Sequence, residues 1–128
     1  MLPAKNHLSL REDPTFFDHA KKHFFPFGVV FYVVSEINST EKEVPALLDF
    51  RATSIIPKKY WNKATDRNYL KRVVTSAVWK AATHKQVVQN THGVQSLHMA
   101  VFLSKKPKED HFEKIVSEME RFFETILV

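Results

Sequence analysis

Apolar side chains recur every three to four residues in three stretches of the chain, which is the spacing of one face of a helix. The first stretch, residues 9–23, predicts a short helix. The second begins between residues 62 and 66 and runs to about Thr83, and the third covers the end of the chain. The predicted core positions are Leu70, Val74, Ala77, Val78 and Ala81 in the second helix, and Phe112, Ile115, Val116, Met119, Phe122, Phe123, Ile126 and Leu127 in the third.

Three other stretches predict strands. Residues 29–35 and 51–56 are rich in β-branched and aromatic side chains. In residues 97–103 every second side chain is predicted to point inward, namely those of Leu97, Met99, Val101 and Leu103. Residues 36–48 predict an exposed loop, and a further short strand would be unsurprising within residues 36–50. The predicted order is α-β-β-α-β-α, an α/β sandwich with a small sheet.

The composition limits what kind of protein this is. A chain of 128 residues suits one domain over residues 1–128, and a hydrophobic share of 44% argues against disorder. The absence of Cys removes disulfides, thiolate nucleophiles and Cys-type zinc sites. No apolar run is long enough to cross a membrane, and the N-terminus lacks the apolar stretch of a signal peptide. We expect a soluble, cytoplasmic protein with no membrane partner.

The net charge of +5 hides an uneven distribution. Residues 50–85 carry nine basic side chains and only Asp66 as an acid, so this segment has a charge of +8 and the rest of the chain −3. A cluster of this kind attracts polyanions, although it is also typical of a solvated helix face. The nine basic residues are Arg51, Lys58, Lys59, Lys63, Arg67, Lys71, Arg72, Lys80 and Lys85.

The spacing of these cations on the second helix favours an anionic partner. Arg67 and Lys71 are four residues apart, as are Asn68 and Arg72, so like charges share a face and repel one another. Arg binds phosphate in a bidentate way, and Asn can donate to or accept from a sugar or a base edge. Lys58, Lys59 and Lys63 precede this helix and extend the cationic surface.

Three aromatic residues lie among these cations. Tyr60, Trp61 and Tyr69 could stack on unpaired bases, or they could pack around the turn. For Trp61 both interpretations stay open.

Metal-binding patterns are sparse. His19 and His23 are four residues apart on the predicted first helix, which is a workable ligand pair, but no third ligand accompanies them. We predict no metal site in the protein.

The segment from Pro57 to Arg72 reads Pro-Lys-Lys-Tyr-Trp-Asn-Lys-Ala-Thr-Asp-Arg-Asn-Tyr-Leu-Lys-Arg. It resembles the signature of the bacterial ribonuclease P protein subunit family, in which a Lys pair at a strand end precedes Arg-Asn-x-x-Lys-Arg. The start of the chain, from Met1 to Leu8, also looks like the start of that family. The resemblance covers nearly the whole chain.

The resemblance implies a ribosomal-protein-like sandwich with a left-handed β-α-β crossover. It also implies an enzyme component without catalytic residues of its own, since the RNA subunit of ribonuclease P holds Mg²⁺ and cuts the 5′ leader from precursor tRNA. The protein would bind that RNA and the leader, and no obligate protein partner is inferred. The alternative is a non-enzymatic RNA-binding or ribosome-associated module that uses the same basic helix.

The residues that match the motif by position, and that the resemblance therefore implies face the RNA, are Lys58, Lys59, Arg67, Asn68, Lys71 and Arg72. Lys63 in the turn joins them. Leader contact in the family uses a cleft between the first helix and the sheet, for which the candidates are Phe17, Phe31 and Tyr32.

The sequence departs from the family pattern at several positions, where we expect fewer contacts with RNA. Arg is usual where His7, Tyr69 and Thr75 stand, Gly is common at Thr53, and an acid or amide is usual at Ser76.

Overall fold

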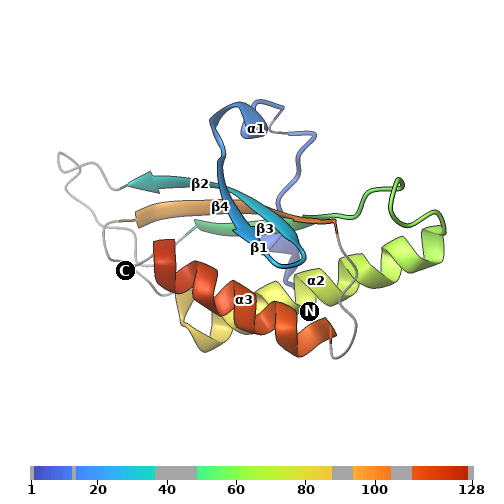
Figure 1. Cartoon of the computed structure of the whole chain (residues 1–128). Helices are drawn as coiled ribbons and strands as arrows, with labels where there is room; N and C mark the ends of the chain where they lie inside the picture. Colours follow the sequence, from blue (N-terminus) through green and yellow to red (C-terminus); the bar gives the residue numbers. More distant parts are fainter. Residues whose placement is uncertain (1, 13, 37–48, 88–93, 105–110, 127–128) are drawn as a thin grey trace.

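Four strands form one mixed sheet with helical elements on both of its faces (Figure 1). The computed structural model describes residues 2–12, 14–36, 49–87, 94–104 and 111–126. In chain order the elements are the 3-10 turn η1 (Ala4–Asn6), α1 (Phe16–His19), β1 (Lys21–Phe25), β2 (Gly28–Glu36), β3 (Asp49–Ile55), α2 (Ala64–His84), β4 (Val94–Leu103) and α3 (His111–Ile126).

The strands lie in the order β1-β2-β4-β3. β1 pairs with β2 and β2 with β4 in antiparallel fashion, whereas β3 and β4 are parallel. Because α2 connects these two parallel neighbours, β3, α2 and β4 form a β-α-β unit. This confirms an α/β fold with a small sheet, and the left hand of the crossover stays a prediction.

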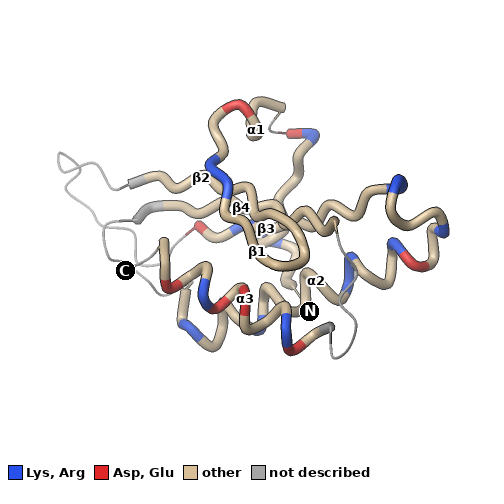
Figure 2. Tube along the Cα trace, viewed as in Figure 1, with Lys and Arg blue, Asp and Glu red and all other residues tan. Residues whose placement is uncertain are grey.

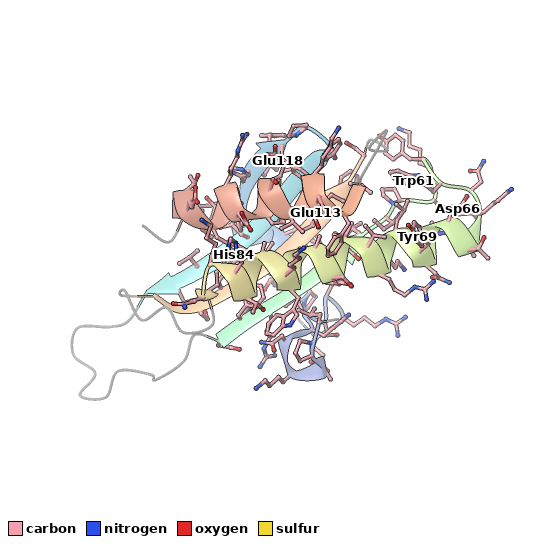
Figure 3. The ribbon with its side chains drawn as sticks, turned by 90° about the horizontal axis from the view of Figure 1, so that it is seen from below. Trp61, Asp66, Tyr69, His84, Glu113 and Glu118 are labelled. Atoms are coloured by element: carbon pink, nitrogen blue, oxygen red, sulfur yellow. The ribbon has the colours of Figure 1, made fainter. Side chains whose placement is uncertain are left out.

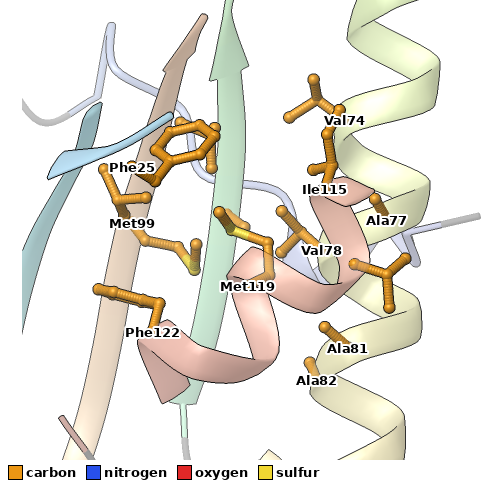
Figure 4. Packing of buried hydrophobic residues seen from close by; sticks show 14 of the residues in the cluster. Phe25, Val74, Ala77, Val78, Ala81, Ala82, Met99, Ile115, Met119 and Phe122 are labelled. Atoms are coloured by element: carbon orange, nitrogen blue, oxygen red, sulfur yellow. The ribbon is translucent and has the colours of Figure 1, made fainter. Parts of the chain in front are cut away.

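The main core lies between the sheet and the helices α2 and α3 (Figure 4). The four inward positions predicted on β4 are all buried, as are the five predicted on α2. On α3 the predicted positions from Ile115 to Phe123 are buried, Phe112 and Ile126 are half-buried, and Leu127 lies outside the described residues. The periodicity of apolar residues therefore identified the core correctly on these three elements. No described helix is long and apolar enough to cross a membrane.

The opposite face of the sheet is covered by the N-terminal segment and α1. Phe16 of α1 is buried together with Leu8 and Ala100. The segment is fixed to the edge strand β3, because the buried Asn6 side chain donates a hydrogen bond to the carbonyl of Phe50 (2.7 Å) and the Leu8 amide donates to the carbonyl of Ala52 (2.9 Å).

The prediction of a helix over residues 9–23 is wrong for most of its length. Only Phe16–His19 is helical, and Lys21–Phe25 forms the strand β1. The turn at Pro26 and Phe27 folds this strand back onto β2, so backbone pairing between the two strands replaces helical hydrogen bonds. The sheet consequently has one more strand than predicted. Residues 37–48 of the predicted loop lie outside the described residues, and so does most of the segment in which a further strand was anticipated.

Candidate nucleic-acid interface

The connection between β3 and α2 is a tight turn held by an aromatic anchor. The amides of Tyr60 and Trp61 both donate to the carbonyl of Pro57 (3.2 Å each), and the Trp61 side chain is only 8% exposed. Trp61 therefore packs in the core and is not available for base stacking. Figure 3 shows Trp61 beside the first turns of α2, near Asp66 and Tyr69.

Arg67 closes this turn from the helix side. Its Nη1 donates to the carbonyl oxygens of Trp61 (2.8 Å) and Asn62 (2.9 Å), and the residue is half-buried. Arg67 therefore does not point freely into solvent. Its guanidinium has five N–H donors, so others remain for a phosphate after the turn is closed.

The other predicted RNA-facing residues are exposed. Lys58 and Lys59 lie in the turn after β3, and Lys63 directly precedes α2. Asn68, Lys71 and Arg72 lie on the outer side of α2, because Leu70 and Val74 turn the opposite side into the core. We call Lys58, Lys59, Lys63, Arg67, Asn68, Lys71 and Arg72 the cationic surface.

Carboxylates neutralise the remaining basic residues of the segment. Arg51 pairs with Asp49 (3.2 Å), Lys80 with Glu113 (2.9 Å), and Lys85 with Glu124. The hydrogen bond between Lys85 and Glu124 lowers the pKa of the Glu124 carboxyl and raises the pKa of the Lys85 ammonium. These three cations consequently project little free charge.

No carboxylate of the described chain pairs with any cation of the cationic surface. The acidic residues of α3 lie along the C-terminal half of α2, whereas the N-terminal half of α2 and the preceding turn extend beyond α3 (Figure 2). Asp66 in the first turn suits the positive end of the helix dipole. Tertiary packing thus concentrates the free positive charge at one end of α2.

A second exposed surface is aromatic and lies across the sheet from α2 and α3, beside α1 (Figure 1). The Phe31 ring makes edge contacts with Phe17 (5.2 Å between centroids) and Phe102 (6.5 Å), and Lys22 Nζ lies 5.9 Å from its centroid. Phe17 is 46% exposed. We call Phe17, Lys22, Phe31 and Phe102 the aromatic surface.

Tyr32 belongs to the other face of the sheet. Its ring contacts Phe122 of α3 (5.1 Å between centroids), on the side that α2 and α3 cover. The structure therefore brings Phe17 and Phe31 together and separates Tyr32 from them, so Tyr32 is not a leader-binding candidate. Lys22 and Phe102 were missed in the sequence: Lys22 because β1 was predicted as helix, and Phe102 because only the inward positions of β4 were considered.

The histidine pair is also separated. His19 lies in α1, whereas His23 lies in β1 with its ring against Phe122 (5.2 Å). The two residues do not share a helix, so the spacing that suggested a ligand pair has no structural meaning. The described residues contain no cluster of three or more His, Asp or Glu side chains that could hold a metal ion.

A pocket of about 500 Å³ adjoins the cationic surface between α2, β3 and the N-terminal segment. Lys71 and Arg72 supply its charge, and the other lining side chains are polar except for Leu2. Four of these are positions where the sequence departs from the family pattern, namely His7, Thr53, Thr75 and Ser76. Four of the five departures therefore gather in one place, where His7, Thr75 and Ser76 are shorter than the residues usual in the family.

Comparison with known proteins agrees with this geometry. A family model described as Ribonuclease P matches residues 2–127. A search of the curated proteins found no match.

Proposed function

Because this chain belongs to the ribonuclease P protein family and so has a role in processing the 5′ ends of precursor tRNA, we propose that its two exposed surfaces bind different RNAs. The family implies two RNA partners, the ribonuclease P RNA and precursor tRNA. The described part of the chain offers two surfaces of different chemistry on opposite faces of the sheet.

The cationic surface binds the ribonuclease P RNA. The observation that carries this assignment is the charge pairing: Arg51, Lys80 and Lys85 are neutralised by carboxylates, whereas every cation within the motif is left without one among the described residues. Like charges kept close together without acidic partners destabilise the free protein slightly, and phosphates relieve that repulsion. Each phosphate contact also releases counterions, which adds to the affinity.

The aromatic surface binds the 5′ leader of precursor tRNA. A single-stranded segment presents unstacked bases, and exposed aromatic rings supply a stacking partner for bases of any sequence. Phe17 presents an exposed ring, Phe31 presents a half-buried ring in contact with it, and Lys22 lies close enough to contact a neighbouring phosphate. A surface that stacks bases and carries one cation suits a leader that differs in sequence from one tRNA to the next.

The protein then contributes binding and positioning, and the RNA subunit contributes the chemistry. We assign the Mg²⁺ ions to the RNA, as the resemblance to this family implies. The protein increases the affinity for precursor over product, because only the precursor carries a leader. The proposed place of action is the cytoplasm.

Reconstitution tests this proposal. Purified protein is added to several bacterial ribonuclease P RNAs at a Mg²⁺ concentration too low for the RNA alone, and cleavage of precursor tRNA at the mature 5′ end is measured. We expect cleavage only when protein and RNA are both present. If the protein binds RNA but stimulates none of these ribonuclease P RNAs, the alternative of a non-enzymatic RNA-binding module replaces this proposal.

A further inference from the structure

A hollow between α2 and α3 lies next to the pocket described above, with which it shares Arg72 and Ser76. Tyr69 and Val73 of α2 and Phe112 of α3 line it, together with Arg72 and Ser76. It has a volume of about 370 Å³ and opens to solvent. Figure 3 shows Tyr69 on α2 close to the beginning of the helix, at the end where the free cations lie.

Tyr69 is the aromatic residue of the motif whose ring has no partner. It is 54% exposed, and its side chain makes no hydrogen bond or ring contact with any described residue. Tyr60 differs, since its ring contacts Trp61 (6.0 Å between centroids) and Lys59 Nζ lies 5.6 Å from its centroid. Of the three aromatics among the cations, only Tyr69 therefore offers an unused face.

Phe112 is held in place as the facing wall of the hollow. Lys80 Nζ lies 5.1 Å from the centroid of its ring and also pairs with Glu113 (2.9 Å). The Phe112 side chain packs partly against the core. A ring fixed in this way loses little conformational freedom when a flat ligand enters beside it.

We propose that this hollow binds a single unpaired base of the ribonuclease P RNA, stacked on Tyr69 beside Phe112, with the adjacent phosphate on Arg72. The inference rests on the proposed function of the cationic surface and adds a base-binding site to it. An aromatic hollow lined by Arg72 matches a ligand that is both flat and anionic, and a base is free to stack only where it is unpaired. The leader is not the expected occupant, because Phe17 and Phe31 lie on the opposite face of the sheet.

The test compares three variants in binding to ribonuclease P RNA without precursor tRNA, over a range of salt concentrations. Tyr69→Leu keeps the apolar volume and removes the stacking ring, so we expect about tenfold weaker binding at every salt concentration. Because no phosphate contact is lost, the slope of log affinity against log salt should stay unchanged. Tyr69→Phe should bind as the wild type does, and so should Phe24→Leu, a control at an aromatic residue on β1 that is 75% exposed.

Wild-type affinity for Tyr69→Leu would overturn the inference, as would an equal loss for Tyr69→Phe, which would assign the effect to the hydroxyl. The same measurement is then repeated with precursor tRNA, and a loss of affinity seen only there would place a leader base in the hollow and contradict the assignment to the ribonuclease P RNA. If the wild-type protein does not stimulate cleavage, the proposed function is wrong, and the base-binding site that rests on it is lost as well. If the wild type stimulates cleavage and Tyr69→Leu binds equally well, only the base-binding site is lost.

Discussion

The Arg67 guanidinium donates a hydrogen bond of 2.8 Å to the carbonyl oxygen of Trp61, so a cation of the motif also holds the turn that presents its neighbours. Arg67→Ala should therefore weaken RNA binding and also lower the free energy of unfolding by about 1 kcal/mol, the usual net value of such a hydrogen bond. Urea denaturation measures the second effect.

Arg72→Ala is the matched control. The Arg72 side chain is exposed and forms no hydrogen bond or ion pair with a described residue, so its loss should weaken RNA binding and leave the urea midpoint unchanged. Equal stability of the two variants would show that the bonds from Arg67 to the turn are not important for folding.

Phe31 and Tyr32 are neighbours in sequence but point to opposite faces of the sheet, so their substitution should have different consequences. Phe31→Ala should weaken binding of precursor tRNA with a long leader and leave the binding of leaderless tRNA unchanged. Tyr32→Ala should instead lower stability by about 2 to 4 kcal/mol, because it leaves space against Phe122. Competition binding in the reconstituted complex, together with urea denaturation, distinguishes the two outcomes. An equal loss for leaderless tRNA in Phe31→Ala would contradict a leader-binding role.

Phe31 and Tyr32 also show how much of the structure could be predicted from the sequence alone. The β-branched and aromatic side chains of residues 29–35 were enough to predict a strand, but which face each residue occupies depends on pairing with β4 and on which elements cover each face. The edge strand β1 was missed because Lys21 and Lys22 give it little apolar character, and its formation depends on pairing with β2. Periodicity succeeded for α2 and α3 because each buries one side of the helix. It succeeded for β4 because large apolar side chains occupy every second position, although Ala100 is buried on the other face.

Gly28 occupies a position where no side chain fits. A Cβ at this position would lie 1.9 Å from the carbonyl oxygen of Phe102 on the neighbouring strand. Gly28→Ala should therefore force the β2–β4 backbones apart and cost about 1 to 3 kcal/mol. Urea denaturation measures the loss, and Val29→Ala provides a comparison at the next position of the same strand. A Gly28→Ala variant as stable as the wild type would contradict the close approach of the two strands.

The ion pair between Lys85 and Glu124 should leave a signature in acid. The pKa of Glu124 is lowered by its hydrogen bond to Lys85, so the pair stabilises the fold above the ordinary carboxyl pKa, and this contribution disappears as the pH falls through the lowered value. Glu124→Gln should be slightly less stable than the wild type at neutral pH, and the difference should vanish in acid. Thermal unfolding at a series of pH values measures it. A difference that persists in strong acid would assign the effect to something other than this charge.

These ion pairs also explain what the sequence could not show about the site. All nine basic residues of the segment look alike in a charge count, and the motif alone singled out those near Arg67. Lys80 is 33 residues from Glu113 in the chain, and their pairing depends on the packing of α3 against α2. The structure thus separates neutralised cations from free ones by tertiary contacts.

Two double variants that remove the same amount of charge test this separation of free from neutralised cations most directly. Lys71→Ala/Arg72→Ala removes two free cations, and Lys80→Ala/Lys85→Ala removes two neutralised ones. The measurement is the slope of log affinity for ribonuclease P RNA against log salt. We predict that the slope becomes shallower by about 1.4 to 1.8 in the first variant, because each of the two lost phosphate contacts contributes about 0.7 to 0.9 to it through counterion release. The slope should stay unchanged in the second variant. An equal change in both variants, or none in the first, would contradict the assignment of the RNA interface to the unpaired cations at the start of α2.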